Sequence, residues 1–324
     1  MYHFESIKLT FIMIPELRHK IERASTYSVF FGSGPHYDER SGRLYHIDQI
    51  AGDCYYMDTK TPAFGKFHLE PGLSFIIPIK GQENKFIVSQ QKKLLTIDWA
   101  TKEVNCVQLI EPSKPTHLND GKCDPKGRLW FGTMWFGTLK WTQAPGLFAF
   151  GLSALYSLDS ASHISLKRDG LSLINGMAWS KDKTKYFVIE SIERQVWAYD
   201  YDNHTGNISN CKIVLDYHES PGILNSVEVP DGMTIDLHDK LWIASYKGKK
   251  VMRIDPETGK ILGIIKTPAI STTSLTWGGS DFRTLYVTTA KDEFVAEAEA
   301  GSIFKVTFEQ ENIRGSANRP FKFK

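Results

Sequence analysis

Oxygen-bearing polar residues recur at a regular place in the chain, ten to twelve residues before a short apolar segment. The six residues at this place are Ser33, Ser74, Asn119, Asn175, Asp231 and Ser274, and Asp120 adds a second carboxylate. Oxygen ligands that include one or two carboxylates suit a hard cation such as Ca²⁺ or Mg²⁺. Asn-Gly and Asp-Gly are also common turn dipeptides, so each residue alone could simply form a turn. The two interpretations differ in whether the fold brings the six residues together.

The apolar segments that follow these residues mark a repeat. They begin at Leu44-Tyr45, Phe86-Ile87, Leu129-Trp130, Tyr186-Phe187, Leu241-Trp242 and Leu285-Tyr286, and successive segments lie 42 to 57 residues apart. A second marker, an apolar residue followed by Asp before a turn, recurs in step at Met57-Asp58, Ile97-Asp98, Leu158-Asp159, Tyr199-Asp200 and Ile254-Asp255, with Val306-Thr307 last. This pattern predicts an all-β fold, a six-bladed β-propeller with four-stranded antiparallel blades. A pair of β-sandwiches is the alternative, since short strands and turns build those as well.

A propeller would gather the polar residues, because the innermost strand of each blade begins near the central axis. Their shared distance from the apolar segments places all of them at the start of that strand. We therefore expect them to face one end of a common tunnel.

The two ends of the chain complete the predicted domain organisation. We expect residues 1–24 to be an N-terminal extension and residues 25–324 to be a single propeller domain. Residues 15–23 have the composition of a short helix that begins at proline, whereas residues 292–300 fall where a hairpin loop is due. Residues 134–152 are rich in aromatic side chains and fit either an outer lid or a further strand pairing. Either residues 24–30 or residues 321–324 would close the ring by pairing with the blade that the other terminus builds.

Composition excludes several classes of function. The formal charge of +2 over 324 residues predicts no broad attraction to nucleic acids or membranes. The apolar run from Leu9 to Ile14 is too short to span a membrane and lacks the flanks of a signal peptide. The four cysteines are widely spaced, which favours reduced thiols over disulfides or a zinc site. We expect a cytoplasmic protein with a small-molecule substrate or ligand, and no nucleic-acid, membrane or protein partner.

Several motifs resemble those of the regucalcin (senescence marker protein), gluconolactonase and luciferin-regenerating enzyme family. They are Gly34-Pro35-His36-Tyr37-Asp38, Leu118-Asn119-Asp120-Gly121-Lys122, Gly132-Thr133-Met134, Ile174-Asn175-Gly176-Met177 and Pro230-Asp231-Gly232-Met233. The similarity runs from about residue 27 to residue 315. It implies a six-bladed propeller, in agreement with the repeat, together with a divalent-metal site and lactone hydrolysis.

The resemblance also implies roles for particular residues. Asn175 and Asp231 match two metal ligands of the family, and Ser33 stands where the family has a Glu ligand. His117 and Asn119 match an Arg and an Asn that hold the substrate, and we add Asp120 beside them. A further family Glu falls at about Gly137. The departures at Ser33, His117 and Gly137 all lie in the expected site.

The resemblance leads to one functional expectation and one alternative. The first is a divalent-metal-dependent, lactonase-like hydrolase that opens a cyclic ester, with Asp231 as metal ligand and general base. Ca²⁺ is the expected cation, with Mg²⁺, Mn²⁺ or Zn²⁺ as alternatives, and Ser33 predicts weak or absent occupancy because affinity follows ligand charge. The alternative is a catalytically impaired propeller that binds a small molecule or calcium and acts as a regulatory protein. We also expect Glu190 to be a solvated loop carboxylate.

Overall fold

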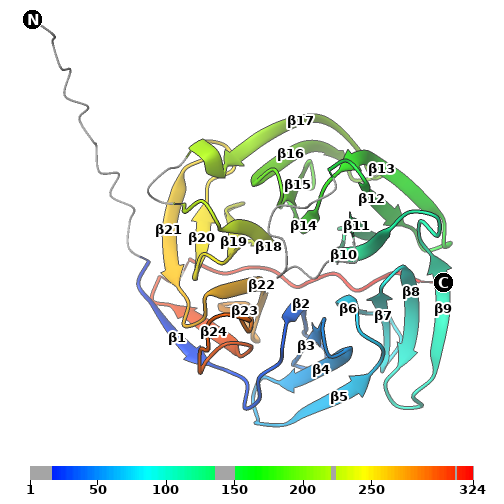
Figure 1. Ribbon diagram of the computed structural model, residues 1–324, viewed down its shortest axis with the longest axis horizontal. Helices are drawn as coiled ribbons and strands as arrows, with labels where there is room; N and C mark the ends of the chain where they lie inside the picture. The colour runs from blue at the N-terminus through cyan, green and yellow to red at the C-terminus, as the bar shows by residue number, and fades with distance from the viewer. Residues whose placement is uncertain (1–16, 136–149, 220–223, 311, 324) are drawn as a thin grey trace, which may run out of the picture.

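The protein is a six-bladed β-propeller (Figure 1), as the repeat predicts. The computed structural model describes residues 17–135, 150–219, 224–310 and 312–323. Six sheets of four antiparallel strands surround one axis, and each apolar segment that marks the repeat lies in the second strand of its blade. No helix in these ranges is long and apolar enough to cross a membrane.

In the first five blades the strands follow one another in chain order from the axis outwards, whereas the outermost strand of the sixth blade is β1 (His19–Arg23). Blades one to three contain β2 (Gly32–Asp38), β3 (Arg43–Asp48), β4 (Asp53–Asp58) and β5 (Phe64–His68); β6 (Leu73–Pro78), β7 (Lys85–Gln90), β8 (Lys93–Asp98) and β9 (Val104–Leu109); and β10 (Thr116–Cys123), β11 (Leu129–Trp135), β12 (Ser153–Leu158) and β13 (Ile164–Leu171). Blades four to six contain β14 (Ile174–Trp179), β15 (Lys185–Glu190), β16 (Gln195–Asp202) and β17 (Asn207–Asp216); β18 (Val229–Ile235), β19 (Leu241–Tyr246), β20 (Lys250–Ile254) and β21 (Ile261–Lys266); and β22 (Ser271–Gly278), β23 (Thr284–Ala290), β24 (Ile303–Phe308) and β1 (His19–Arg23). A short 3₁₀ helix, η1 (Tyr217–Glu219), follows β17.

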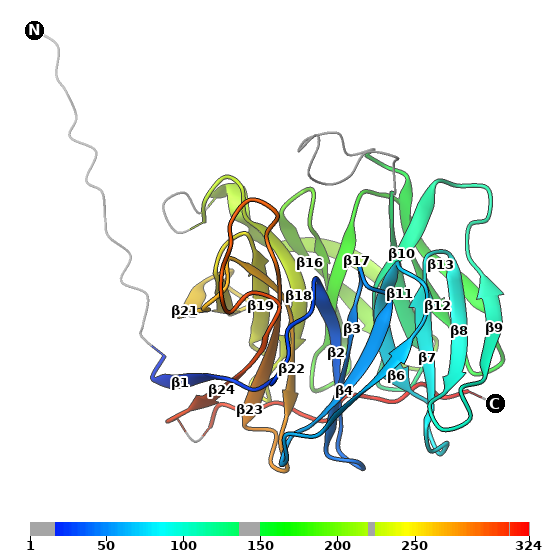
Figure 2. The same ribbon diagram turned by 60° about the horizontal axis from the view of Figure 1, so that its bottom comes forward.

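The ring is closed by the N-terminal strand. β1 pairs with β24 in antiparallel register, from His19 opposite Phe308 to Arg23 opposite Phe304 (Figure 2). The helix predicted for residues 15–23 is therefore wrong over residues 19–23. The free edge of β24 and the packing of Ile21 on the core of blades five and six outweigh the local helix propensity. The sixth blade thus includes part of the segment that we assigned to an extension, and it closes just before residues 24–30.

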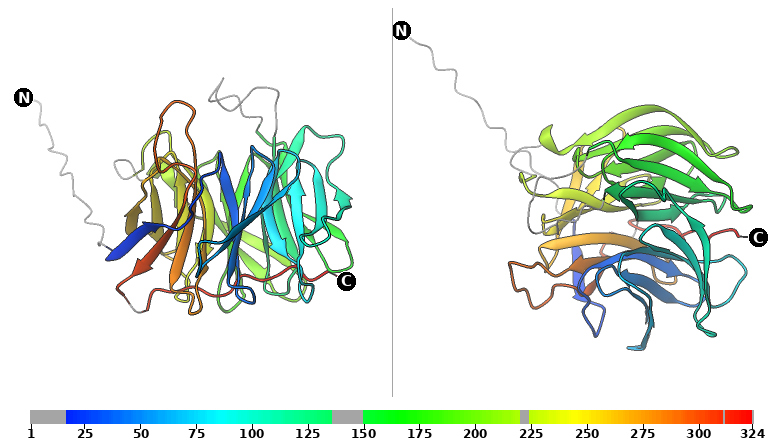
Figure 3. Two further views of the ribbon diagram at one scale, coloured as in Figure 1. Left: turned by 90° about the horizontal axis from the view of Figure 1, so that it is seen from below. Right: turned by 45° about the vertical axis from the view of Figure 1, so that its right-hand side comes forward.

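The C-terminal segment covers the lower face of the ring, opposite the face where the inner strands begin (Figure 3, left). It bonds to blade five through Leu237 N and Arg314 O at 2.9 Å, and to blade two through Phe321 N and Pro78 O at 2.9 Å. The Phe321 side chain is fully buried in the core between blades two and three. The C-terminal segment therefore crosses the lower end of the axis.

Candidate functional site

A cavity of about 390 Å³ lies around the axis at the upper face. It is lined by all six of the residues that we predicted as metal-binding, substrate-binding or catalytic: Ser33, His117, Asn119, Asp120, Asn175 and Asp231. Ser74 also lines the cavity, whereas Ser274 of the sixth blade is not among the lining residues. The fold therefore brings together residues that lie up to 198 positions apart in the chain.

Most of these residues lie in, or directly beside, a β-bulge of an inner strand. The register between the first and second strands shifts from Ser33 to His36, and corresponding shifts occur at residues 73–76, 118–121, 174–177 and 230–233, with a shift at 272–274 in the sixth blade. A bulge leaves residues out of the hydrogen-bonded ladder and re-aims their side chains. Here the unpaired residues include Asn119, Asn175 and Asp231, so the bulges account for the convergence of these side chains on the axis.

The glycines that follow Asn175 and Asp231 are required by close packing around the axis. A Cβ atom at Gly176 would lie 2.2 Å from the backbone nitrogen of Met233 in the next blade. One at Gly232 would lie 2.2 Å from Ser274 Oγ. The Asn-Gly and Asp-Gly pairs are therefore not hairpin turns, and the turn interpretation is wrong at both positions.

A chain of hydrogen bonds fixes the Asn175 amide. Its Nδ2 donates to Ser191 Oγ at 3.1 Å, and Ser191 Oγ donates to the carbonyl of Pro230 at 2.6 Å. Sequence reasoning missed Ser191, although a signal was present. Ser or Thr recurs near the end of the second strands, as at Ser89, whose Oγ accepts from the backbone nitrogens of the β6 bulge.

The floor of the cavity is acidic. Burial, followed by the neighbouring Asp120, raises the pKa of the Asp231 carboxyl well above its usual range, and Asn175 offsets part of this effect. Burial also raises the pKa of Asp120, against the opposing influence of Lys122. The Lys122 ammonium donates to Met177 O at 3.2 Å and Met233 O at 2.9 Å, and burial lowers its pKa to about 8. Two carboxyl groups that disfavour each other's ionisation are typical of functional sites, including cation sites.

The donor set fits a hard cation, with few carboxylates. Asp231, Asn175 and Ser33 would hold the ion, and all three offer oxygen. Within the described ranges, no group of three or more His, Cys, Asp and Glu side chains could hold a metal ion. A cation here would therefore depend on neutral oxygens beside the carboxylates, which predicts modest affinity.

Three further residues for which the sequence predicted a role or a position are His117, Glu190 and Gly137. His117 lines the cavity, and burial together with Lys92 lowers its pKa, which favours the neutral imidazole. Glu190 is 1% exposed and accepts hydrogen bonds from the backbone nitrogens of residues 172, 173 and 192, so the prediction of a solvated loop carboxylate is wrong. Gly137 and most of the aromatic segment 134–152 lie outside the described residues.

The fold and the cavity define a class of protein, the six-bladed propellers with an oxygen-lined axial site. Within this class, the chain belongs to the SMP-30/gluconolactonase/LRE-like family, whose model matches residues 31–291. It is 33% identical to zebrafish (Danio rerio) regucalcin over 281 residues, covering 85% of this chain and 90% of the relative. It is 33% identical to human regucalcin over 294 residues, covering 89% and 94%. Membership of this family supports a lactonase-type function.

Solved structures agree with the family. A luciferin-regenerating enzyme superposes with a TM-score of 0.85 at 28% identity, covering 94% of this chain and 100% of that one. A regucalcin from Agrobacterium tumefaciens, described as a calcium-binding protein, has a TM-score of 0.82 at 19% identity, covering 96% and 99%. A gluconolactonase from Xanthomonas campestris has a TM-score of 0.69 at 17% identity, covering 91% and 95%. The last two likenesses, at low identity, support the fold alone.

Proposed function

We propose that the protein is a divalent-cation-dependent lactonase-type hydrolase in which Asp231 is both a cation ligand and the general base. The observation that carries this proposal is the convergence of Asp231, Asp120 and Asn175 on the floor of one axial cavity. The family supports the reaction type. Ca²⁺ is the cation that we propose, because the donors are oxygen atoms and two of the side chains are carboxylates.

When bound by Asp231, Asn175 and Ser33, the cation would supply polarisation of the lactone carbonyl. The chain's own residues would do the rest. Asp231 accepts a proton from a water molecule while the water oxygen bonds to the carbonyl carbon. The ring C–O bond then breaks, and the ring oxygen takes the proton back from Asp231, which gives a hydroxy acid and restores the Asp231 carboxylate.

The other polar residues of the cavity would position the substrate. Asn119 is held by a hydrogen bond from its Nδ2 to Ile174 O at 2.8 Å, and His117 lies two residues before it on β10. Both residues line the cavity, so both side chains can contact a ring bound there. The proposed partner is thus a small molecule, and no nucleic acid, membrane or protein partner forms part of the proposal. A cytoplasmic location would suit the four free cysteines.

One observation favours a second candidate, a catalytically impaired propeller that binds a small molecule or calcium. Ser33 offers a neutral hydroxyl where the family resemblance implies a carboxylate, so the site has lost charge at a ligand position. Loss of charge there weakens both cation binding and the electrostatic stabilisation of the transition state.

Calorimetry and turnover together test the proposal. Chelator-treated protein would be titrated with Ca²⁺ and Mn²⁺, and a panel of lactones would be assayed with each cation. Asp231→Asn should abolish both cation binding and turnover, whereas Asp281→Asn, at an exposed position in a turn of the lower face, should change neither. Cation binding without turnover of any lactone would favour the second candidate. Turnover that survives in Asp231→Asn would overturn the proposed role of Asp231.

A further inference from the structure

The wall of the cavity is apolar above its polar floor. Large apolar side chains line it in four of the blades and in the loop between β23 and β24: Phe31, Ile50, Met134, Leu173, Val229 and Phe294. Three of them stand two residues before a floor residue, as Val229 does before Asp231. These side chains line the same cavity as the floor residues that follow them. The apolar surface is therefore part of the binding site.

Some of this apolar surface is open to solvent at the mouth of the cavity. Ile50 is 56% exposed and Phe294 is 75% exposed. Exposed apolar surface that is continuous with a cavity marks a binding region more often than a scattered surface residue does. A ligand that extends from the floor to the mouth would cover both side chains.

Several side-chain hydrogen-bond donors on the floor bond to the protein itself and not toward the cavity. Ser74 Oγ donates to Leu118 O at 2.8 Å, and Asn119 Nδ2 donates to Ile174 O at 2.8 Å. Asn175 Nδ2 likewise donates to Ser191 Oγ at 3.1 Å. A ligand rich in hydroxyl groups needs a partner for each hydroxyl, because polar groups left without partners in a buried site weaken binding. These internal bonds favour a ligand with few hydroxyl groups beyond its ring.

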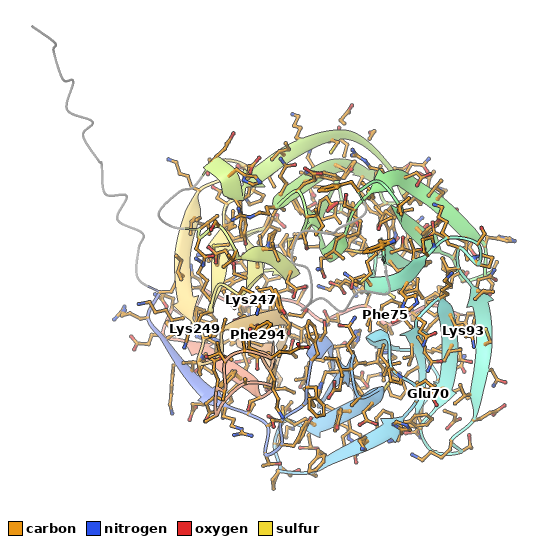
Figure 4. All side chains as sticks on the ribbon, in the orientation of Figure 1. Glu70, Phe75, Lys93, Lys247, Lys249 and Phe294 are labelled. Atoms are coloured by element: carbon orange, nitrogen blue, oxygen red, sulfur yellow. The ribbon has the colours of Figure 1, made fainter. Side chains whose placement is uncertain are left out.

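The loop between β23 and β24 holds Phe294 at the mouth. Asp292 accepts a hydrogen bond from the Phe294 backbone nitrogen at 2.8 Å and forms an ion pair with Lys247 of the neighbouring blade. Farther along the loop, Glu297 accepts from the Ile270 backbone nitrogen at 2.8 Å. These contacts tie the loop to blade five and to Ile270, which lies between β21 and β22. Lys247 and Phe294 lie close together in the view down the axis (Figure 4).

We infer that the preferred substrates are lactones that carry an apolar alkyl or aryl substituent, with the ring on the floor and the substituent against the wall and Phe294. This inference rests on the proposed function for the reaction, and on the cavity alone for the ligand class. A volume of about 390 Å³ is within the range of pockets that take drug-sized ligands. Each buried methylene group should raise kcat/KM roughly fourfold until the substituent reaches the mouth.

A homologous series of γ-lactones tests the inference. The expected result is that γ-nonalactone exceeds γ-butyrolactone in kcat/KM by at least about 50-fold, and exceeds glucono-δ-lactone as well. Phe294→Ala should reduce the ratio between nonalactone and butyrolactone at least about fivefold. Phe64→Ala, which truncates a 48% exposed phenylalanine on the outer strand of blade one, should leave that ratio unchanged. A preference for glucono-δ-lactone would overturn the inference while leaving the proposed reaction intact.

Binding of lactams separates the two proposals. The alkyl lactam 5-pentylpyrrolidin-2-one and the unsubstituted 2-pyrrolidinone differ only in the apolar substituent, and neither requires catalysis. If no lactone is hydrolysed but the alkyl lactam binds at least about tenfold more tightly, with the difference reduced in Phe294→Ala, the ligand class stands and the proposed reaction fails. Equal binding of the two lactams would refute the ligand class whatever the enzyme does with lactones.

Discussion

Replacing Ser33 by glutamate is the sharpest test of the cation site. Ser33 is half-buried, borders the bulge of β2, and lines the same cavity as Asn175 and Asp231. Ser33→Glu therefore places a third carboxyl group over a floor that already holds Asp120 and Asp231. In the absence of a cation the variant should be less stable than the wild type, and in its presence the order should reverse.

The magnitudes follow from charge and partial exposure. Two like charges about 5 Å apart repel by about 3 kcal/mol at an effective dielectric constant near 20, and partial exposure reduces this to about 1–2 kcal/mol. A destabilisation of that size lowers the Tm of a chain this long by about 2–4 °C. One further carboxylate ligand should tighten Ca²⁺ binding about 10- to 100-fold, which corresponds to about 1.4–2.7 kcal/mol.

The assay is thermal unfolding with and without Ca²⁺, together with calorimetric titration. Ser33→Gln is the matched control, because it adds nearly the same volume and an oxygen ligand without the charge. The glutamate variant should gain much more Tm from Ca²⁺ than the glutamine variant does. If the two variants respond alike, or if neither responds to Ca²⁺, charge at position 33 does not govern cation binding and the placement of Ser33 in the site is wrong.

Two further predictions concern the strand that carries Asp231. Asp236 is 3% exposed, accepts a hydrogen bond from Trp242 Nε1 at 3.1 Å and forms an ion pair with Arg253 at 2.7 Å. Asp236→Asn should therefore lower the free energy of unfolding, measured in urea, by about 3 kcal/mol. The control Asp281→Asn should change it by no more than about 0.5 kcal/mol. For chelated protein, the raised pKa of Asp231 means that the folded state keeps a proton that the unfolded chain releases. Stability should therefore fall as the pH rises from the ordinary aspartate pKa through the raised value, and Asp231→Asn should flatten this decline in Tm.

The blades were predictable because each one repeats the same local sequence signals. A continuous apolar run such as Leu241–Ala244 must be buried on both faces, and the Asp that ends the third strand can close the following turn, as Asp58 does through Lys60 N and Thr61 N. These signals depend only on neighbouring residues. Their number and period therefore determine the six blades without knowledge of any long-range contact.

The features that sequence reasoning missed depend on distant partners. Residues 19–23 read locally as a helix, and only the open edge of β24, almost three hundred residues later, makes them a strand. The charge on Glu190 suggests a solvated position, but in the folded chain the backbone nitrogens of residues 172 and 173 donate hydrogen bonds to its carboxylate. The apolar wall was also missed, because Phe294 lies in a loop that is held at the cavity by distant contacts, among them the ion pair of Asp292 with Lys247.

The bulges explain how a site can change while the fold persists. Asp231 lies outside the paired register and Ser33 lies at the last pair before a bulge, so either side chain can be exchanged at little cost to the strand pairing. The glycine after Asp231 cannot be exchanged in the same way, because the next inner strand approaches it too closely. The packing therefore constrains the glycine at position 232 more tightly than the residue just before it. Position 33 is therefore the position at which measurements of cation binding and turnover would test the proposed site most directly.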